Sequence, residues 1–178
     1  MFIVYAVPVG LLVGLLLGGR VGALANLRIR WAWLAVVGFV VQLAIYSMQI
    51  GDWLGDAVPV VYVLSNVAVL VAVLRNLALP GMAIVAIGAV CNLGAIVANG
   101  GYMPADPGAL ATAGVDTSGP SNSIVVADPA LRLLTDIFAI PAAIPLANVF
   151  SVGDVLIGIG VATVIAVAMR AAPEPATA

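Results

Sequence analysis

The stretch GMAIVAIGAVCNLGAIVANGGYMP, residues 81–104, predicts both the architecture of this chain and the place where it leaves a membrane. From Gly81 to Asn99 it carries no charged side chain, and it approaches the length of about 20 apolar residues that an α-helix needs to cross a bilayer. The apolar run stops at Gly100 and Gly101, which permit a turn, and Pro104 prevents the helix from continuing. We therefore expect a transmembrane helix that ends in an exposed turn.

Four other apolar segments of near-bilayer length accompany this one. They are Phe2–Gly19, Trp31–Ile50, Ala57–Leu74 and Val155–Met169, the last extending back through Ser151. The first segment could be confused with a signal peptide, but no basic residue precedes it and Arg20 follows it. We therefore interpret all five segments as transmembrane helices. The predicted fold class is an all-α integral membrane protein with five transmembrane helices in a single membrane domain, residues 1–178.

The composition supports this interpretation and excludes several function classes. Of the 178 residues, 64% are hydrophobic and 8% are charged, whereas a soluble domain carries about 25% charged residues. Too few polar side chains remain to cover a surface that faces water, so lipid must cover most of it. The chain has no histidine, its single cysteine is Cys91, and its net charge of −2 gives no reason to expect nucleic acid. No metal site and no cofactor are expected.

The distribution of charge predicts the orientation. Arg20, Arg28 and Arg30 follow the first segment, Arg75 follows the third and Arg170 follows the fifth, whereas Arg132 alone lies on the opposite side. The positive-inside rule then places the N-terminus outside and the C-terminus in the cytoplasm. The acidic residues agree, because all of them except Glu174 fall on the outer side: Asp52, Asp56, Asp106, Asp116, Asp128, Asp136 and Asp154. We expect a multi-pass protein of the bacterial cytoplasmic (inner) membrane.

Residues 100–153 contain the long extramembrane stretch and are predicted to form an outer cap. The tripeptide ADP occurs at 105–107 and again at 127–129. An aspartate followed by proline is typical of a helix start, because the carboxylate accepts free backbone N–H groups and the proline loses no hydrogen bond there. The sequence therefore predicts two short cap helices, the first of them closed by Gly114.

A proline-broken segment completes the predicted cap. Pro141 and Pro145 interrupt any helix through residues 136–150. We expect this segment to dip toward the membrane, as a re-entrant stretch, or to lie along its outer face. Irregular backbone at that depth persists only where protein or a wet cavity covers it, so a site is expected here.

The sequence SVGD, residues 151–154, has two interpretations. Its spacing is typical of a capping box, in which Ser151 and Asp154 bond to each other's backbone N–H groups at the start of the last helix. The alternative pairs Asp154 with Asp136, since two carboxyl groups that share a proton can activate water for amide hydrolysis. In one continuous helix these residues would lie about 27 Å apart, so the pair requires a chain that doubles back at the two prolines.

Four motifs, in this order and spacing, resemble a family of small bacterial polytopic membrane proteins of unknown function, the DUF5317 family. They are GGRVGALANLRIRWAWL (18–34), RNLALPG (75–81), ANGGYMP (98–104) and LTDIFAIP…PLANVFSVGDVLIGIG (134–160). The resemblance implies a polytopic topology and no particular chemistry. It further suggests one constellation on the outer face, formed by Asn99, Gly100, Met103, Pro104, Asp136, Asn148, Ser151 and Asp154.

A partial resemblance concerns the last helix alone. NVFSVGDVLIGIG, residues 148–160, looks like the final motif of signal peptidase II, an aspartyl protease that processes lipoproteins. That family carries a second catalytic aspartate in the preceding helix, and the corresponding position here, near Ala95, is not acidic. The resemblance therefore counts against protease activity as much as for it.

Several residues inside the apolar segments are interpreted as helix-packing positions. Gly10, Gly14 and Gly18 form a doubled small-xxx-small pattern that lets another backbone approach closely. The partner helix can belong to this chain or to a second copy in a homo-oligomer. Polar residues such as Asn66 and Asn92 are expected to form hydrogen bonds between helices.

Three hypotheses for function remain open. The first is a non-catalytic membrane protein, alone or as a subunit of a complex, that binds a lipid, an apolar small molecule or a partner membrane protein at its capped outer face. Its candidate contact residues are Asn99, Tyr102, Met103, Pro104, Asn148 and Ser151. The second is an intramembrane hydrolase or transferase that uses Asp136 and Asp154. The third is a small transporter, which the lack of a charged residue in mid-segment argues against.

Overall fold

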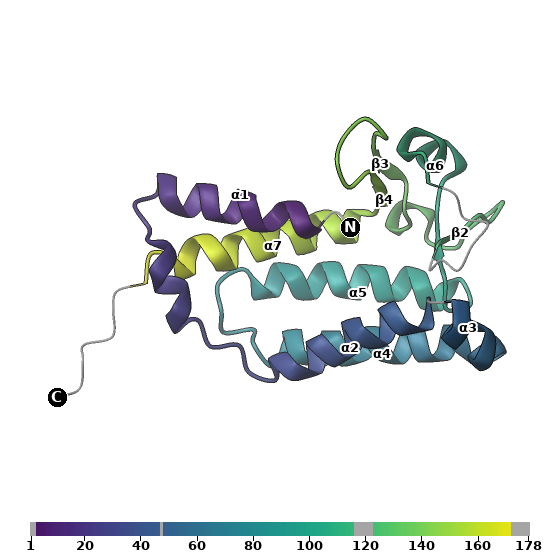
Figure 1. Ribbon diagram of the computed structural model, residues 1–178, viewed down its shortest axis with the longest axis horizontal. Coiled ribbons are helices and arrows are strands. Elements are labelled where there is room, and N and C mark those ends of the chain that lie inside the picture. The colour runs from purple at the N-terminus through teal and green to yellow at the C-terminus, as the bar shows by residue number, and fades with distance from the viewer. Residues whose placement is uncertain (1–2, 47, 116–122, 172–178) are drawn as a thin grey trace.

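The computed structural model describes residues 3–46, 48–115 and 123–171, and most of them are helical, in agreement with an all-α fold class (Figure 1). The elements in chain order are α1 (Ile3–Leu16), the 3-10 helix η1 (Val21–Asn26), α2 (Ala32–Ile45), α3 (Met48–Leu54), η2 (Gly55–Ala57), α4 (Val58–Leu74), α5 (Met82–Ala98), β1 (Met103–Pro104), α6 (Pro107–Ala113), β2 (Ser123–Ile124), η3 (Arg132–Leu134), β3 (Phe138–Ile140), β4 (Asn148–Phe150) and α7 (Val152–Ala168). Phe2, Asp116 and Glu174, which the sequence arguments use, lie outside the described residues.

Within the described residues, five long helices form an elongated bundle, packed side by side in the order α1, α7, α5, α4, α2 (Figure 1). Helices α1, α4 and α7 run in one direction, and α2 and α5 run in the other. The segment that joins α5 to α7 lies at one end of the bundle, above the start of α7, where the sequence predicts a cap. The first and last long helices, α1 and α7, are therefore neighbours and run parallel to each other.

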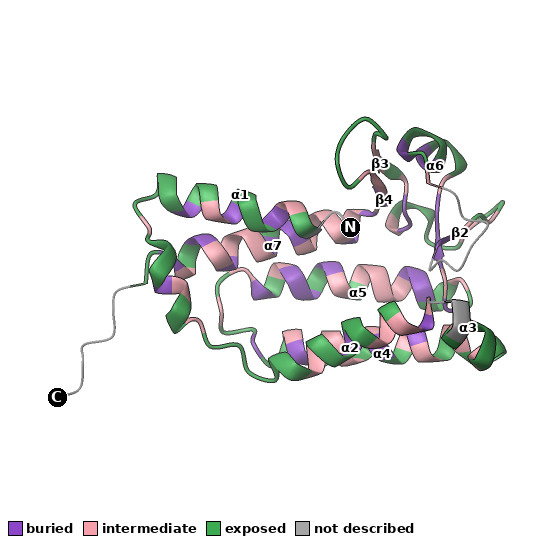
Figure 2. Cartoon of the chain, in the orientation of Figure 1, coloured by how far each residue is buried: buried purple, intermediate pink, exposed green. Residues whose placement is uncertain are grey.

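The five long helices of the described residues each turn an exposed face outward (Figure 2), and these faces carry large apolar side chains. Each helix exposes at least one large aliphatic side chain over about half of its surface or more; examples are Leu12, Leu43, Leu64, Ile87 and Ile159. In a protein surrounded by water, an amphipathic helix would turn charged or polar residues outward. Here the exposed faces of the helices carry large aliphatic side chains instead.

One helix among the described residues is long and apolar enough to cross a membrane by length and composition. It is the continuous stretch Ile50–Leu74, 25 residues, which joins the end of α3 through η2 to α4. The other apolar helices have 10–17 residues and are Val4–Leu16, Ala32–Ile45, Met82–Ala98 and Val152–Ala168. Each of these helices overlaps one of the apolar segments expected from the sequence, but Ile50–Leu74 begins seven residues before the expected Ala57, and Ala32–Ile45 ends five residues before the expected Ile50.

The predicted segment Trp31–Ile50 is divided in the structure. Helix α2 ends at Ile45, and Tyr46 leaves the helical conformation with φ −95° and ψ 8°. The Tyr46 ring packs edge-on against Tyr62 of α4, with the ring centroids 5.4 Å apart. Gly51 permits the change of direction, because a Cβ there would lie 2.9 Å from the carbonyl oxygen of Ile45.

The first predicted cap helix is confirmed. The Asp106 carboxylate accepts the N–H groups of Gly108 and Ala109 at 2.8 and 3.1 Å, and Pro107 occupies the first helical position of α6. Gly114 closes the helix in the left-handed conformation with φ 64°. Two short sheets complete the cap: β1 pairs in parallel with β2, and β3 pairs antiparallel with β4.

The second predicted cap helix, starting at Asp128, is not formed; the structure has only the short 3-10 helix η3 there. Two features prevent an α-helix. Leu131 adopts a left-handed conformation with φ 53°. The backbone N–H and C=O of Ala130 are hydrogen-bonded to the side chain of Asn99, so they are not available to a helix.

The proline-broken segment 136–150 contains a β-hairpin rather than a helix. Phe138 pairs with Phe150 and Ile140 with Asn148, and the two phenylalanine rings stack with their centroids 5.4 Å apart. Pro141 and Pro145 lie in the exposed loop of the hairpin, where no ladder hydrogen bond is needed. The Tyr5 hydroxyl of α1 donates to the Pro145 carbonyl, which joins the hairpin loop to the first helix.

Candidate functional site

A polar cluster lies where α7 begins beneath the cap, and its first part is the capping box expected from SVGD. The Ser151 hydroxyl accepts the backbone N–H of Asp154 at 3.0 Å. The Asp154 carboxylate accepts the backbone N–H of Ser151 through Oδ2 at 3.1 Å. The capping box is therefore confirmed, and it places a carboxylate in the first turn of α7, where the helix dipole favours negative charge.

Asn92 of α5 adds a second layer of hydrogen bonds to this capping box. Its Nδ2 donates to Asp154 Oδ1 at 2.8 Å, and its Oδ1 accepts from the Ser151 hydroxyl at 2.7 Å. Ser151 is completely buried. Both carboxylate oxygens of Asp154 thus accept a hydrogen bond, and the expected role of Asn92 in bonding between helices is confirmed.

Two glycines allow α5 and α7 to approach closely enough for these bonds. A Cβ on Gly88 would lie 2.5 Å from the carbonyl oxygen of Gly153. A Cβ on Gly153 would clash with Asn92 Oδ1 and would lie 2.7 Å from the carbonyl oxygen of Gly88. Any larger residue at either position would push the helices apart, since real Cβ atoms do not approach so closely.

Asp136 lies in the cap, between η3 and β3, and not in one of the long helices. Its backbone N–H donates to the Pro104 carbonyl at 3.0 Å, and its own carbonyl accepts from Asp106 N–H at 2.9 Å. This parallel bridge extends the strand that begins at Met103. The Asp136 side chain is 6% exposed, and its Oδ1 has no hydrogen-bond partner among the described residues.

The protonation of Asp136 is affected by its burial and by the charge of Asp154. Burial, followed by the negative charge of Asp154, raises the pKa of Asp136 to about 7. The β3–β4 hairpin returns the chain to the bundle, so the long separation expected for a continuous helix does not arise. Within the described residues no hydrogen bond joins the two carboxyl groups, because Asp154 bonds to Ser151 and Asn92 instead.

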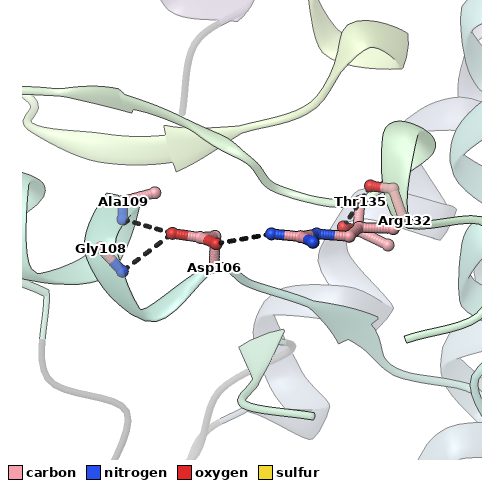
Figure 3. Close-up of polar contacts among 5 residues, drawn as sticks. All are labelled: Asp106, Gly108, Ala109, Arg132 and Thr135. Carbon is pink, nitrogen blue, oxygen red and sulfur yellow. Dashed lines mark hydrogen bonds and ion pairs between the residues drawn. The ribbon is translucent and has the colours of Figure 1, made fainter. Parts of the chain in front are cut away.

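Asp106 connects the two halves of the cap (Figure 3). Its Oδ1 caps α6, while its Oδ2 lies 3.7 Å from the guanidinium of Arg132. The Thr135 hydroxyl donates to the Arg132 carbonyl at 2.8 Å and so fixes the turn that precedes Asp136. Arg132 is 70% exposed, so this ion pair contributes little to stability and serves mainly to orient the loop.

The amide of Asn99 is used by the backbone of the cap. Its Nδ2 donates to the Ala130 carbonyl at 2.9 Å and to the Ala95 carbonyl at 2.8 Å. Its Oδ1 accepts the Ala130 N–H at 2.9 Å. Asn99 therefore attaches the segment around Ala130 to the end of α5.

The other contact candidates occupy different environments. Met103 and Pro104 are buried, and Met103 belongs to a core cluster with Tyr62 and Ile96. Tyr102 is half-buried, and Asn148 lies half-buried in β4 opposite Ile140. The structure thus joins Ser151 and Asp154 to Asn92 by hydrogen bonds, while Met103 and Pro104 are buried in the protein interior.

The glycines of the first helix face α7 of the same chain. A Cβ on Gly10 would lie 2.9 Å from the backbone of Ala162, and one on Gly14 would lie 2.5 Å from the sulfur of Met169. Gly18 lies past the end of α1 with φ 78°, and a Cβ there would meet no atom within 4 Å. The surface of α1 that carries Gly10 and Gly14 is therefore filled by α7.

An apolar groove of about 470 Å³ runs along this α1–α7 contact. Its lining residues are Tyr5, Ala6, Val9, Val13 and Leu17 of α1 or the turn after it, with Val155, Gly158, Ile159, Ala162, Thr163, Ala166 and Val167 of α7. None is charged, and the Thr163 hydroxyl donates to the Ile159 carbonyl of its own helix. The volume is in the range of small-molecule sites, about 300–1,000 Å³.

Neither this groove nor the link between Asn92 and the capping box was predicted from the sequence. One side of the groove is lined by residues of α1 and the turn after it that follow one another at intervals of four: Tyr5, Val9, Val13 and Leu17. Because most other residues of α1 are also apolar, this spacing does not stand out in the sequence. Among the described residues no group of three or more His, Cys, Asp or Glu side chains could hold a metal ion.

The model of a family of unknown function, DUF5317, matches residues 26–166. The match begins at the end of η1, includes the cap and the polar cluster, and extends through most of α7. No curated protein and no solved structure matches the chain. Since the matched residues make up most of the sequence, the chain belongs to the DUF5317 family.

Proposed function

We propose that this protein crosses the bacterial cytoplasmic membrane five times, with its N-terminus outside and its C-terminus in the cytoplasm, and binds a lipid acyl chain without catalysing a reaction. The observation that carries the proposal is the uncharged groove of about 470 Å³ between α1 and α7. An acyl chain fits such a groove because it offers no hydrogen-bonding group and needs none.

The length and surface of the helices support a membrane location. Helices α4, α5 and α7 have 17 residues each, the lower limit of about 17–25 residues for a transmembrane helix. Their exposed aliphatic side chains would contact lipid favourably and water unfavourably. The arginines that follow α1, α4 and α7 lie at the end of the bundle opposite the cap, as the positive-inside rule requires for this orientation.

The groove is a better candidate site than the residues first expected on the capped outer face. Met103 and Pro104 are buried in the core, and the amide of Asn99 is occupied by Ala130. The groove, by contrast, extends over the thirteen residues from Tyr5 to Leu17, about 18 Å of helix. A membrane lipid reaches it by diffusing sideways.

Retention of lipid during purification in mild detergent, measured by native mass spectrometry, tests the proposal. The wild-type protein should retain phospholipid, and Val9→Trp and Val13→Trp, which fill the groove, should lose it. Leu43→Trp on the exposed face of α2 is the matched control and should retain lipid as the wild type does. Equal retention in the groove variants and the control would contradict the proposal.

One observation favours a second candidate, an aspartyl hydrolase. Asp136 is buried, and burial and the charge of Asp154 raise its pKa to about 7, so it is partly protonated at neutral pH and could donate a proton while a second carboxylate accepts one. Against this candidate, both oxygens of Asp154 are already engaged by Ser151 and Asn92. Turnover of peptide or lipid substrates that disappears in Asp136→Asn and in Asp154→Asn would support it.

A further inference from the structure

We propose that the lipid held in the α1–α7 groove is an anionic phospholipid, and that its headgroup binds in a hollow lined by Arg20 and Asn26 at the arginine-rich end of the bundle. This inference rests on the proposed function, because it assigns the headgroup of the lipid whose acyl chain occupies the groove. It specifies a ligand with a negatively charged headgroup in the cytoplasmic leaflet of the membrane.

The hollow is a separate cavity of about 410 Å³, lined by Arg20, Gly22, Ala23 and Asn26. It lies at the 3-10 helix η1, which connects α1 to α2 at the end of the bundle away from the cap. A Cβ on Gly22 would meet no atom within 4 Å, so the space above η1 is open. A guanidinium and a side-chain amide both donate hydrogen bonds, which suits a phosphate group.

The hollow and the groove are linked through short stretches of chain. Leu17 and Val167 are the last residues of α1 and α7 to line the groove, counted along the sequence, and Arg20 follows Leu17 by three residues. The backbone N–H of Arg20 donates to the carbonyl of Met169, two residues past Val167, at 2.8 Å. This bond fixes the start of the hollow to the end of α7, so one lipid molecule can occupy both spaces.

The charge at this end of the bundle favours an anionic lipid over a zwitterionic one. Arg30 is held there through its backbone, which exchanges two hydrogen bonds with the Asn76 side chain after α4. Arg75 closes α4 and lies over the Trp31 ring, with 5.6 Å between its guanidinium carbon and the ring centroid. Among the described residues the ion pair present, Arg132 with Asp106, lies in the cap, so the charge of Arg20 is not neutralised by a carboxylate there.

Binding of phosphatidylglycerol and phosphatidylcholine to the delipidated protein in detergent, followed by native mass spectrometry, tests this inference. The wild type should prefer phosphatidylglycerol, and Arg20→Gln should weaken its binding by about five-fold while binding of phosphatidylcholine stays unchanged. Arg132→Gln, in the exposed cap, is the matched control and should leave both lipids bound as before. Arg20→Lys should restore part of the preference.

The outcomes separate this inference from the proposed function. Saturable binding of both lipids with equal affinity would overturn the anionic headgroup and leave the acyl-chain groove standing. A preference for phosphatidylglycerol that survives Arg20→Gln would overturn the hollow as the headgroup site. Absence of saturable binding of either lipid would overturn both. Unchanged thermal stability of Arg20→Gln shows that the variant remains folded.

Discussion

The side chains of Asn92 and Asp154 form a hydrogen bond of 2.8 Å between residues that are 62 positions apart in the sequence. Because Asn92 also accepts from the Ser151 hydroxyl, one amide closes the capping box of α7 from the neighbouring helix α5. The start of the last helix is therefore determined by two elements, and the cap that precedes it is held at a defined place on the bundle.

Removing this amide should destabilise the protein. In Asn92→Leu the Asp154 Oδ1 and the Ser151 hydroxyl both lose their partner in a part-buried site, which we expect to lower the free energy of unfolding by about 1–3 kcal/mol. Denaturant or SDS titration of the purified protein measures the difference. Asn66→Leu is the matched control: within the described part of the chain its amide donates to the Tyr62 carbonyl of its own helix α4, and the loss should be smaller. Equal losses would contradict the bridging role of Asn92.

Alanine substitutions at two glycines of α5, Gly88 and Gly94, should have different effects on stability. Gly88→Ala places a Cβ 2.5 Å from the Gly153 carbonyl oxygen, so α5 and α7 must separate, and we expect a loss of about 1–3 kcal/mol. Gly94→Ala meets only the far end of Leu131 at 4.0 Å and should be neutral or stabilising by about 0.5–1 kcal/mol. Thermal unfolding of both variants under identical detergent conditions checks the pair. A stable Gly88→Ala protein would show that the close helix contact is not required.

The helices could be predicted from the sequence because each is a local feature. Apolar runs bounded by arginine, glycine or proline indicate their own ends, and the ends of α4 and α5 lie within one residue of the expected positions. The capping box at Ser151 and the cap at Asp106 likewise depend on residues within three positions. Such short-range patterns need no knowledge of the rest of the fold.

The cap and the candidate site could be predicted only in part, because they depend on distant contacts. The helix expected after Asp128 is prevented by Asn99, about 30 residues earlier, through bonds that no local pattern reveals. The hairpin that places Asp136 near Asp154 depends on the pairing of Phe138 with Phe150. The spacing between Pro141 and Pro145 indicated a break in the helix, but it could not distinguish a hairpin from a re-entrant segment.

Asn99 should control the order of the cap. Asn99→Ala removes two hydrogen bonds to the Ala130 backbone, so the amides around Leu134 and Thr135 should exchange with deuterium faster, while those of α5 and α7 should not change. Hydrogen exchange followed by mass spectrometry measures the protection of the cap segment and of helices α5 and α7 in one experiment. Thr112→Ala, which loses a hydroxyl bond within α6, is the control and should leave the segment around Ala130 protected. Uniform loss of protection over all helices would instead indicate global destabilisation.

The carboxyl group of Asp136 should make stability depend on pH in a definite direction. Its pKa is raised from 3.8 to about 7, so below pH 4 it is neutral in both the folded and the unfolded chain. Between about pH 4 and pH 7 the carboxyl group ionises mainly in the unfolded chain, and the stability of the folded protein therefore falls as the pH rises. Above pH 7 the full penalty remains, at most roughly 4 kcal/mol.

Asp136→Asn removes this penalty, because the amide stays neutral, so the variant should be more stable than the wild type at pH 8 and little changed at pH 4. Unfolding curves of both proteins across this range measure the difference, with the exposed Asp56→Asn as a control that should follow the wild type. A wild-type protein whose advantage over Asp136→Asn grows toward pH 8 would show that the ionised carboxylate has a favourable partner.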